Sequence, residues 1–292
     1  LPAVGTVTLA DGTPVTNGQV LTAAQLAGLQ FDAPADQLAA TTTSFSYSVS
    51  DGTVTVNAGT TINVTPVNDA PVASSSTITV AEESVNTPLG LAAPTDVDGD
   101  ALTITVTGLP SVGTVTLADG TPVTNGQVLT AAQLGGLQFD APADQLAATT
   151  TTFTYSVSDG TVTVNAGTTI NVTPVNDAPV AFSLTITVAE ESVNTPLGLA
   201  APTDVDGNPL TITVTGLPTV GTVTLADGTP VTNGQALTAA QLAGLQFDAP
   251  ADQLAATTTS FSYSVSDGTV TVNAGTTINV TPVNDAPVAS SS

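Results

Sequence analysis

Apolar and polar residues alternate with a period of two along most of the chain. Residues 102–106 read Leu-Thr-Ile-Thr-Val, and residues 153–157 read Phe-Thr-Tyr-Ser-Val. Such alternation is typical of half-buried antiparallel strands, which turn one face to the core and the other to water. Within one module it predicts seven strands, at 77–81, 87–91, 101–107, 113–118, 137–140, 150–158 and 161–173. Seven short strands in about 100 residues predict an all-β, Greek-key sandwich of the immunoglobulin type.

Turn signals separate these strands. Ser158-Asp159-Gly160 predicts a hairpin, and Ala118-Asp119-Gly120 predicts a similar one. Residues 130–134 form the one helix-like stretch, and Gly135-Gly136 ends it. For Asp119 and its copies, a role in forming the turn is the preferred interpretation, because Asp and Gly are common turn residues.

The hexapeptide Pro-Val-Asn-Asp-Ala-Pro occurs three times, at 66–71, 174–179 and 282–287, with a spacing of 108 residues. Two prolines keep such a segment stiff and extended, so it predicts a short rigid linker between modules. The modules are then a truncated one at 1–69, whole ones at 70–177 and 178–285, and the start of another at 286–292. The first lacks counterparts of 77–108, so we expect Phe45, Tyr47 and Val49 to be partly uncovered.

The amino-acid composition excludes several kinds of interaction and several classes of function. The 292 residues include 24 carboxylates but no Lys, Arg, His or Cys, so no side-chain salt bridge or disulfide can form. A charge of −24 excludes nucleic acid and anionic membrane surfaces as partners, and no apolar run is long enough to span a membrane. His, Cys and Lys are absent as bases or nucleophiles, and the acid pairs recur in every module, so the sequence predicts no enzyme.

Strands that reverse at each step place alternate loops at opposite ends of a module. This brings the acids of the second and sixth loops onto the linker before a module, and those of the first and fifth loops onto the linker after it. The residues expected to gather are Asn68, Asp69, Asp96, Asp98, Asp100 and Asp159 at the first linker; Glu82, Glu83, Asp140, Asp144, Asn176, Asp177, Asp204, Asp206 and Asp267 at the second; and Glu190 and Glu191 at the third. Six to eight oxygen ligands suit Ca²⁺, whereas Zn²⁺ prefers Cys or His. The alternative for any single loop is a solvated turn without metal.

The module resembles the cadherin-like repeats of large bacterial surface adhesins, which are often exported by type I secretion. The likeness is carried by Ala81-Glu82-Glu83-Ser84, Asp96-Val97-Asp98-Gly99-Asp100, the 153–160 stretch and the Asn-Asp linker. In cadherins, calcium is bound between domains, and the resemblance assigns that role to Glu82 or Glu83, Asp140 or Asp144, Asn176 with Asp177, and Asp204 with Asp206. The loop 140–144 lacks the cadherin acid-Arg-acid motif, and Asn208 stands where the preceding copy has Asp100.

These observations predict a structural, extracellular repeat array of a bacterial cell surface, stiffened by Ca²⁺: an adhesin stalk, a filament or a biofilm matrix component. Its partners would be further copies of the repeat in a longer chain, with lateral or end-to-end self-association into filaments. The alternative is a carbohydrate- or surface-binding module that acts through its Thr-rich strand faces. Thr is also a common exposed strand residue, which explains those faces without a ligand.

Overall fold

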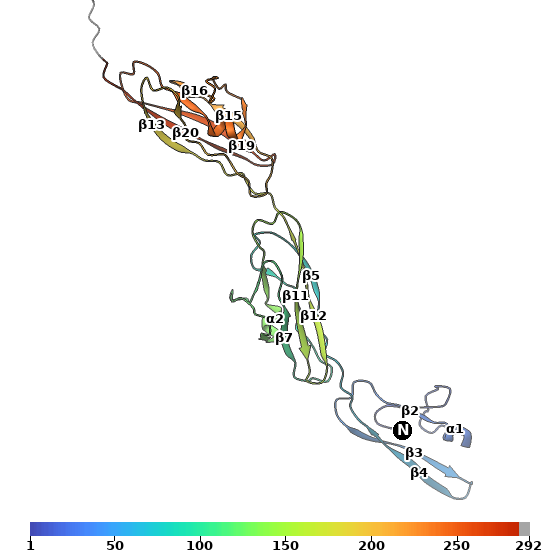
Figure 1. Ribbon diagram of the computed structural model, residues 1–292. Coiled ribbons are helices and arrows are strands. Elements are labelled where there is room, and N and C mark those ends of the chain that lie inside the picture. Colours follow the sequence, from blue (N-terminus) through green and yellow to red (C-terminus); the bar gives the residue numbers. More distant parts are fainter. Residues whose placement is uncertain (286–292) are drawn as a thin grey trace, which may run out of the picture. The chain divides into compact units, whose positions relative to one another are not determined.

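The computed structural model describes residues 1–285, so the predicted start of a further module at 286–292 lies outside the described residues. The chain forms two compact units (Figure 1). The first holds residues 1–80, 84–142 and 150–172, and the second holds 81–83, 143–149 and the chain from Thr173 onward. Among the described residues, no helix is long and apolar enough to cross a membrane.

The strands between residues 76 and 173 form a sandwich of two sheets. One sheet has the order β6-β10-β8 and the other the order β5-β12-β11-β7-β9. Consecutive strands from β5 to β11 alternate between the two sheets, and β11 and β12 are neighbours in the same sheet. The elements are β5 (Ser76–Ala81), β6 (Thr87–Pro88), β7 (Thr103–Gly108), β8 (Thr114–Thr116), β9 (Val128–Leu129), α2 (Ala131–Gly135), β10 (Gln138–Asp140), β11 (Thr149–Ser158) and β12 (Thr163–Thr173). The all-β, immunoglobulin-like fold predicted from the periodicity is confirmed.

The core lies between the two sheets and is filled by the apolar face of each strand. Phe153, Tyr155 and Val157 of β11 are fully buried, while the intervening Thr and Ser residues point outward. Phe139 of β10 and Leu89 meet them from the other sheet. The helix α2 begins after Thr130, whose hydroxyl accepts the backbone N–H of Gln133 in a capping box.

The expected strand count is wrong by one, because β9 is an eighth strand. It pairs with β7 through Ile104 and Thr105, opposite Leu129 and Val128. Two residues are too few to produce an alternating pattern, so the sequence carried no signal for it. The predicted strand at 87–91 is shorter than expected and covers only Thr87–Pro88.

The same architecture recurs in the second unit, with sheets of order β14-β18-β16 and β13-β20-β19-β15-β17. The first strand, β13, runs parallel to the last, β20. Its core again centres on Phe247, Phe261 and Tyr263. The elements are β13 (Leu184–Ala189), β14 (Thr195–Pro196), β15 (Thr211–Gly216), β16 (Thr222–Thr224), β17 (Ala236–Leu237), α3 (Ala239–Ala243), β18 (Gln246–Asp248), β19 (Thr257–Ser266) and β20 (Thr271–Thr281).

Residues 1–64 of the first unit form only part of this sandwich. They contain β1 (Thr6–Thr8), α1 (Ala23–Ala27), β2 (Gln30–Asp32), β3 (Thr41–Ser50) and β4 (Thr55–Val64), in two separate two-stranded sheets. Val49 is 58% exposed, whereas its copy Val157 is fully buried. Tyr47 is half-buried, so two of the three predicted residues are uncovered, but Phe45 is buried at 8% exposure. It packs with Val7, Leu9 and Val15 in a small cluster.

Candidate metal centre

The linker at Asn176-Asp177 is tied to two loops of the repeat that follows it. The backbone N–H of Asp177 donates to Asp206 Oδ2 at 2.7 Å. The side-chain amide of Asn176 donates to Asp267 Oδ2 at 2.8 Å and to its neighbour's carbonyl, Asp177 O, at 3.0 Å. Flanking prolines remove competing N–H donors and keep the segment extended, which fixes the direction of these groups.

Glu82 approaches the same linker from the end of β5. Its side chain is buried at 4% exposure, and Oε1 accepts the backbone N–H of Val175 at 2.6 Å. Oε2 accepts the backbone N–H of Gln145. Glu83, by contrast, is exposed and has a positive φ of 61°. Of the two glutamates that the sequence could not separate, Glu82 therefore lies at the linker.

Three carboxylates meet at this point in the second unit. One oxygen each from Glu82, Asp177 and Asp206 lies within 4.8 Å of the other two. Partial burial, followed by the negative charges of Asp206, Glu82, Asp144 and Asp204, raises the pKa of Asp177. The chain has no Lys, Arg or His to neutralise this cluster. Its acids therefore repel one another, and the repulsion favours a proton or a cation among them.

The first linker repeats part of this arrangement in the first unit. The amide of Asn68 donates to Asp159 Oδ2 at 2.9 Å, and the N–H of Asp69 donates to Asp98 Oδ2 at 2.6 Å. Oxygens of Asp96, Asp98 and Asp100 lie within 4.8 Å of one another.

One oxygen in each Asp-x-Asp loop has no hydrogen-bond partner. Asp96 Oδ1 accepts the N–H groups of Asp98 at 2.9 Å and of Asp100 at 3.3 Å, whereas Asp96 Oδ2 is buried and unpartnered. Asp204 Oδ2 is in the same state in the next repeat. A buried carboxylate oxygen without a partner is costly, and a bound cation would satisfy it. Oxygens 4.8 Å apart fit one Ca²⁺, because Ca–O distances are about 2.4 Å.

The two loops differ at Asn208, which replaces Asp100. The Asn208 amide donates to Asn176 Oδ1 at 3.0 Å, a bond that a carboxylate could not make. This side chain removes one negative charge and ties the loop to the linker instead.

The other predicted acids, Asp140, Asp144, Glu190 and Glu191, belong to neither group of three converging carboxylates. Asp140 Oδ1 accepts the N–H of Asn86 at 2.7 Å, and Asp144 adopts a positive φ of 57°. Glu190 repeats the Glu82 contacts, with Oε1 accepting the N–H of Val283 at 2.5 Å and Oε2 that of Gln253. Glu191 is exposed.

Asp159 and Asp267 serve the hairpin turns as well as the linkers. The side-chain amide of Asn68, followed by the backbone N–H groups of Val162 and Thr161, lowers the pKa of Asp159. Asn176, Val270 and Thr269 lower the pKa of Asp267 in the same order. Each carboxylate is thus held ionised by donors from two segments of the chain.

Sequence reasoning missed the partners that orient Glu82. They are backbone N–H groups of Val175 and Gln145, and no side-chain motif marks a backbone donor. The carboxylate spacing and the linker were visible in the sequence, but the position of residues 143–149 beside Glu82 depends on the fold.

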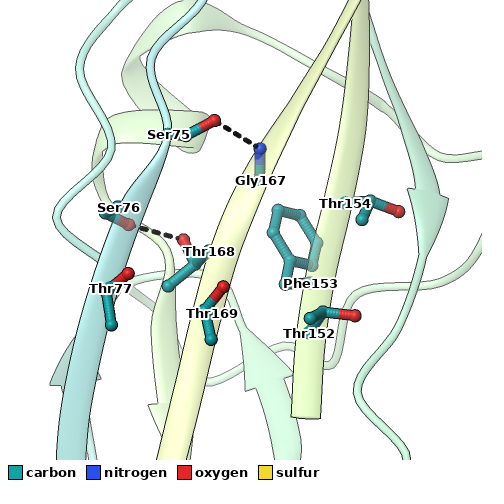
Figure 2. A pocket seen from close by; sticks show the side chains of 9 residues that line it. All are labelled: Ser75, Ser76, Thr77, Thr152, Phe153, Thr154, Gly167, Thr168 and Thr169. Atoms are coloured by element: carbon teal, nitrogen blue, oxygen red, sulfur yellow. Dashed lines mark hydrogen bonds between the residues drawn. The ribbon is translucent and has the colours of Figure 1, made fainter.

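A second feature is an open hollow of about 420 Å³ on the five-stranded sheet of the first unit. Hydroxyl groups from β5, β11 and β12 surround it (Figure 2). Ser76 Oγ donates to the carbonyl of Leu89 at 2.6 Å and lies 2.8 Å from Thr168 Oγ1, so two of these hydroxyls bond within the protein. The third repeat has Leu184 in place of Ser76.

Several solved structures match the chain at low sequence identity and low TM-score. An endo-fucoidan hydrolase from glycoside hydrolase family 107 is 21% identical over 97% of this chain and 38% of its own, with a TM-score of 0.29. Extracellular cadherin domains 1–5 of protocadherin gamma B2 are 15% identical over 97% and 53%, with a TM-score of 0.43. Drosophila N-cadherin EC1-4 is 11% identical over 95% and 67%, with a TM-score of 0.32.

This chain spans 38% of the fucoidan hydrolase and 53% of the protocadherin structure. No curated protein matches the chain. The family model described as "Bacterial Ig domain" matches residues 68–173 and again residues 176–281, which together make up most of the sequence. The tandem Ig-like repeats predicted from the sequence are thereby confirmed, and the chain belongs to the bacterial Ig domain family.

Proposed function

We propose that this chain is part of an extracellular structural array of a bacterial cell surface, in which Ca²⁺ bound at the Asn-Asp linkers stiffens the succession of repeats. The observation that carries the proposal is the meeting of Glu82, Asp177 and Asp206 within 4.8 Å in a chain without basic side chains. Family membership supports a surface or extracellular location. Near-identical tandem repeats suit a role in reach, as in an adhesin stalk, a filament or a biofilm matrix.

The residues that would hold the ion are those whose oxygens converge. At the second linker these are Glu82, Asp177 and Asp206, with Asp204 Oδ2 as a further oxygen that has no hydrogen-bond partner. At the first linker they are Asp96, Asp98 and Asp100. The ion would offset the mutual repulsion of the carboxylates and connect the linker to the next repeat. Asn208, which stands where the loop of the first linker has Asp100, implies different affinities at the two sites.

Calcium titration of the whole chain tests this function. We expect the melting temperature to rise with added Ca²⁺, because a ligand at 100 times its Kd stabilises the folded state by about 2.7 kcal/mol. Chelation should reverse the shift and broaden the distance distribution in small-angle scattering. A melting curve and a scattering profile that ignore both calcium and chelator would disprove the proposal.

Asp206→Ala removes one ligand from the second linker without touching the core. We expect the variant to fold, to bind less calcium and to show a smaller thermal shift. The matched control is Asp227→Ala, which removes the same charge from a hairpin tip where Asp227 Oδ1 accepts the backbone N–H of Thr229 at 2.9 Å. Its calcium response should match the parent chain. If Asp206→Ala fails to fold in excess calcium, Asp206 instead serves the structure of its own repeat.

The second candidate function is binding of a carbohydrate or another surface through the Thr-rich faces. The hydroxyl-lined hollow around Gly167 is the observation in its favour (Figure 2). It is weakened by Ser76 and Thr168, which bond to one another, and by Leu184, which replaces Ser76 in the third repeat. Glycan binding that is lost in Ser76→Leu would favour this candidate over the calcium array.

A further inference from the structure

The linker asparagine Asn176 is held at both ends of its side-chain amide. Its Nδ2 donates to Asp267 Oδ2 at 2.8 Å and to the carbonyl of Asp177 at 3.0 Å. Its Oδ1 accepts a hydrogen bond from the side-chain amide of Asn208 at 3.0 Å. Both polar atoms of this side chain are therefore bonded within the protein, and two of the bonds tie the linker to loops of the repeat that follows.

The equivalent side chain of the first linker is held through its nitrogen. Asn68 Nδ2 donates to Asp159 Oδ2 at 2.9 Å and to the carbonyl of Asp69 at 3.0 Å. Asp100 occupies the position of Asn208. An ionised carboxylate has no hydrogen to donate to Asn68 Oδ1, so this loop cannot make the bond that its copy makes.

The difference at this position changes the charge of the loop and keeps its backbone turn. The N–H of Asp100 donates to Asp96 Oδ1 at 3.3 Å. In the next repeat, the N–H of Asn208 donates to Asp204 Oδ1 at 3.1 Å. Oxygens of Asp96, Asp98 and Asp100 converge within 4.8 Å, whereas Asn208 places a neutral amide at the third position. The repulsion between carboxylates that a cation would relieve is therefore weaker inside the second loop.

A second difference between the repeats lies next to the first. Pro209 follows Asn208, whereas Ala101 follows Asp100. A proline restricts the backbone of the residue before it and lowers the conformational freedom of the unfolded chain. The proline thus reduces the entropy that is lost when Asn208 bonds to Asn176. Both differences favour a loop that stays attached to the linker through its own hydrogen bonds.

We propose that the Asn208 amide keeps the second linker attached to its repeat at calcium concentrations too low to fill the site, whereas the first linker, whose loop has Asp100, needs the ion. The inference rests on the proposed calcium function and adds its regulation. Calcium concentration then controls the attachment of one linker and leaves the other attached throughout.

Hydrogen exchange of the whole chain in chelator, followed by mass spectrometry, tests the proposal. Fragments that reach Phe182 differ in mass from their counterparts at the first linker, where Ser74 stands, so the two linkers are observed separately. They report the N–H groups of Asp69 and Asp177, which donate to the following loops. Each variant is compared with the parent chain at the same linker.

Two reciprocal exchanges give opposite expected results. Asn208→Asp should speed exchange at the second linker about fivefold, the factor that one ordinary hydrogen bond contributes, and added calcium should slow it again. Asp100→Asn, made together with Ala101→Pro, should slow exchange at the first linker by a similar factor. Unchanged exchange in both variants would overturn the proposal and leave the calcium function standing if calcium still slows exchange in the parent.

Asn208→Ala is the control that separates the hydrogen bond from the charge. It removes the amide without adding a carboxylate, and we expect it to speed exchange at the second linker by itself. If only Asn208→Asp has an effect, repulsion controls the linker and the proposal is wrong. If calcium slows exchange at neither linker of the parent, the calcium function fails together with the ion dependence of the first linker, and Asn208→Ala in chelator still decides the role of the amide.

Discussion

The side-chain amide of Asn176 donates a hydrogen bond of 2.8 Å to the Asp267 carboxylate, although 91 residues separate the two in the sequence. The bond connects the linker to the hairpin turn between β19 and β20. The same contact, at 2.9 Å, joins Asn68 to Asp159. The linkers at Asn68 and Asn176 are therefore each tied to the hairpin turn between the last two strands of the repeat that follows.

Asn176→Ala should raise the pKa of Asp267 towards its ordinary value of 3.8, because the Asn176 amide is the largest cause of its lowering. Carboxyl ¹³C titration by NMR measures this directly. The control is Asn68→Ala, which should move Asp159 and leave Asp267 alone. If Asp267 titrates identically in the parent and in Asn176→Ala, the contact does not persist in solution.

The hairpin aspartates predict a loss of stability in acid. Backbone and side-chain bonds from Thr121 lower the pKa of Asp119 below 3.8. Between that folded-state pKa and 3.8 the unfolded chain binds more protons, so stability is intact above pH 3.8 and falls as pH falls through the folded pKa. Asp119→Asn should remove part of this dependence. Urea midpoints measured from pH 2 to pH 5 test it; parallel profiles for the parent and the variant would contradict it.

The hydroxyl groups of Thr168 and Thr276, which occupy the same position in two repeats, are expected to change the free energy of unfolding in opposite directions. Thr168 Oγ1 lies 2.8 Å from Ser76 Oγ, whereas the buried Thr276 Oγ1 has no partner because Leu184 replaces that serine. Thr→Val keeps the shape and removes the hydroxyl. We therefore expect Thr168→Val to destabilise by about 1 kcal/mol and Thr276→Val to stabilise by about 1 kcal/mol. Calorimetry on the two variants decides the point: shifts of the same sign would contradict the assigned bonds.

Gly167 is required by a close approach of two strands. A Cβ at this position would lie 2.2 Å from the carbonyl oxygen of Phe153, which cannot move without breaking the ladder. Gly167→Ala should therefore destabilise by about 1–3 kcal/mol. Gly135→Ala is the matched control, because its nearest neighbour is 3.7 Å away and both other repeats have Ala there. It should be neutral or stabilising in chemical denaturation, and equal losses in both variants would refute the close-contact explanation.

The sequence by itself determined the repeat, seven of the eight strands of a sandwich, the hairpin turns and the helical turn after Thr130. These features are local: alternation places side chains on two faces, Asp-Gly permits tight turns, and Thr with Gln three residues later caps a helix. Strand parity also predicted that the loop with Asp98 lies at the first linker and the Glu82-Glu83 pair at the second, because reversing strands leave few choices for where a loop can lie.

Only the tertiary structure decided the features that depend on contacts between residues far apart in the sequence. It separated Glu82 from Glu83, because the backbone N–H groups of Val175 and Gln145 donate hydrogen bonds to the carboxylate of Glu82. It added β9, which is a strand only where β7 lies beside it. Val49 and Val157 have nearly identical local sequences, yet one is exposed and the other buried. Burial is a property of the whole packed assembly, and no local pattern can specify it.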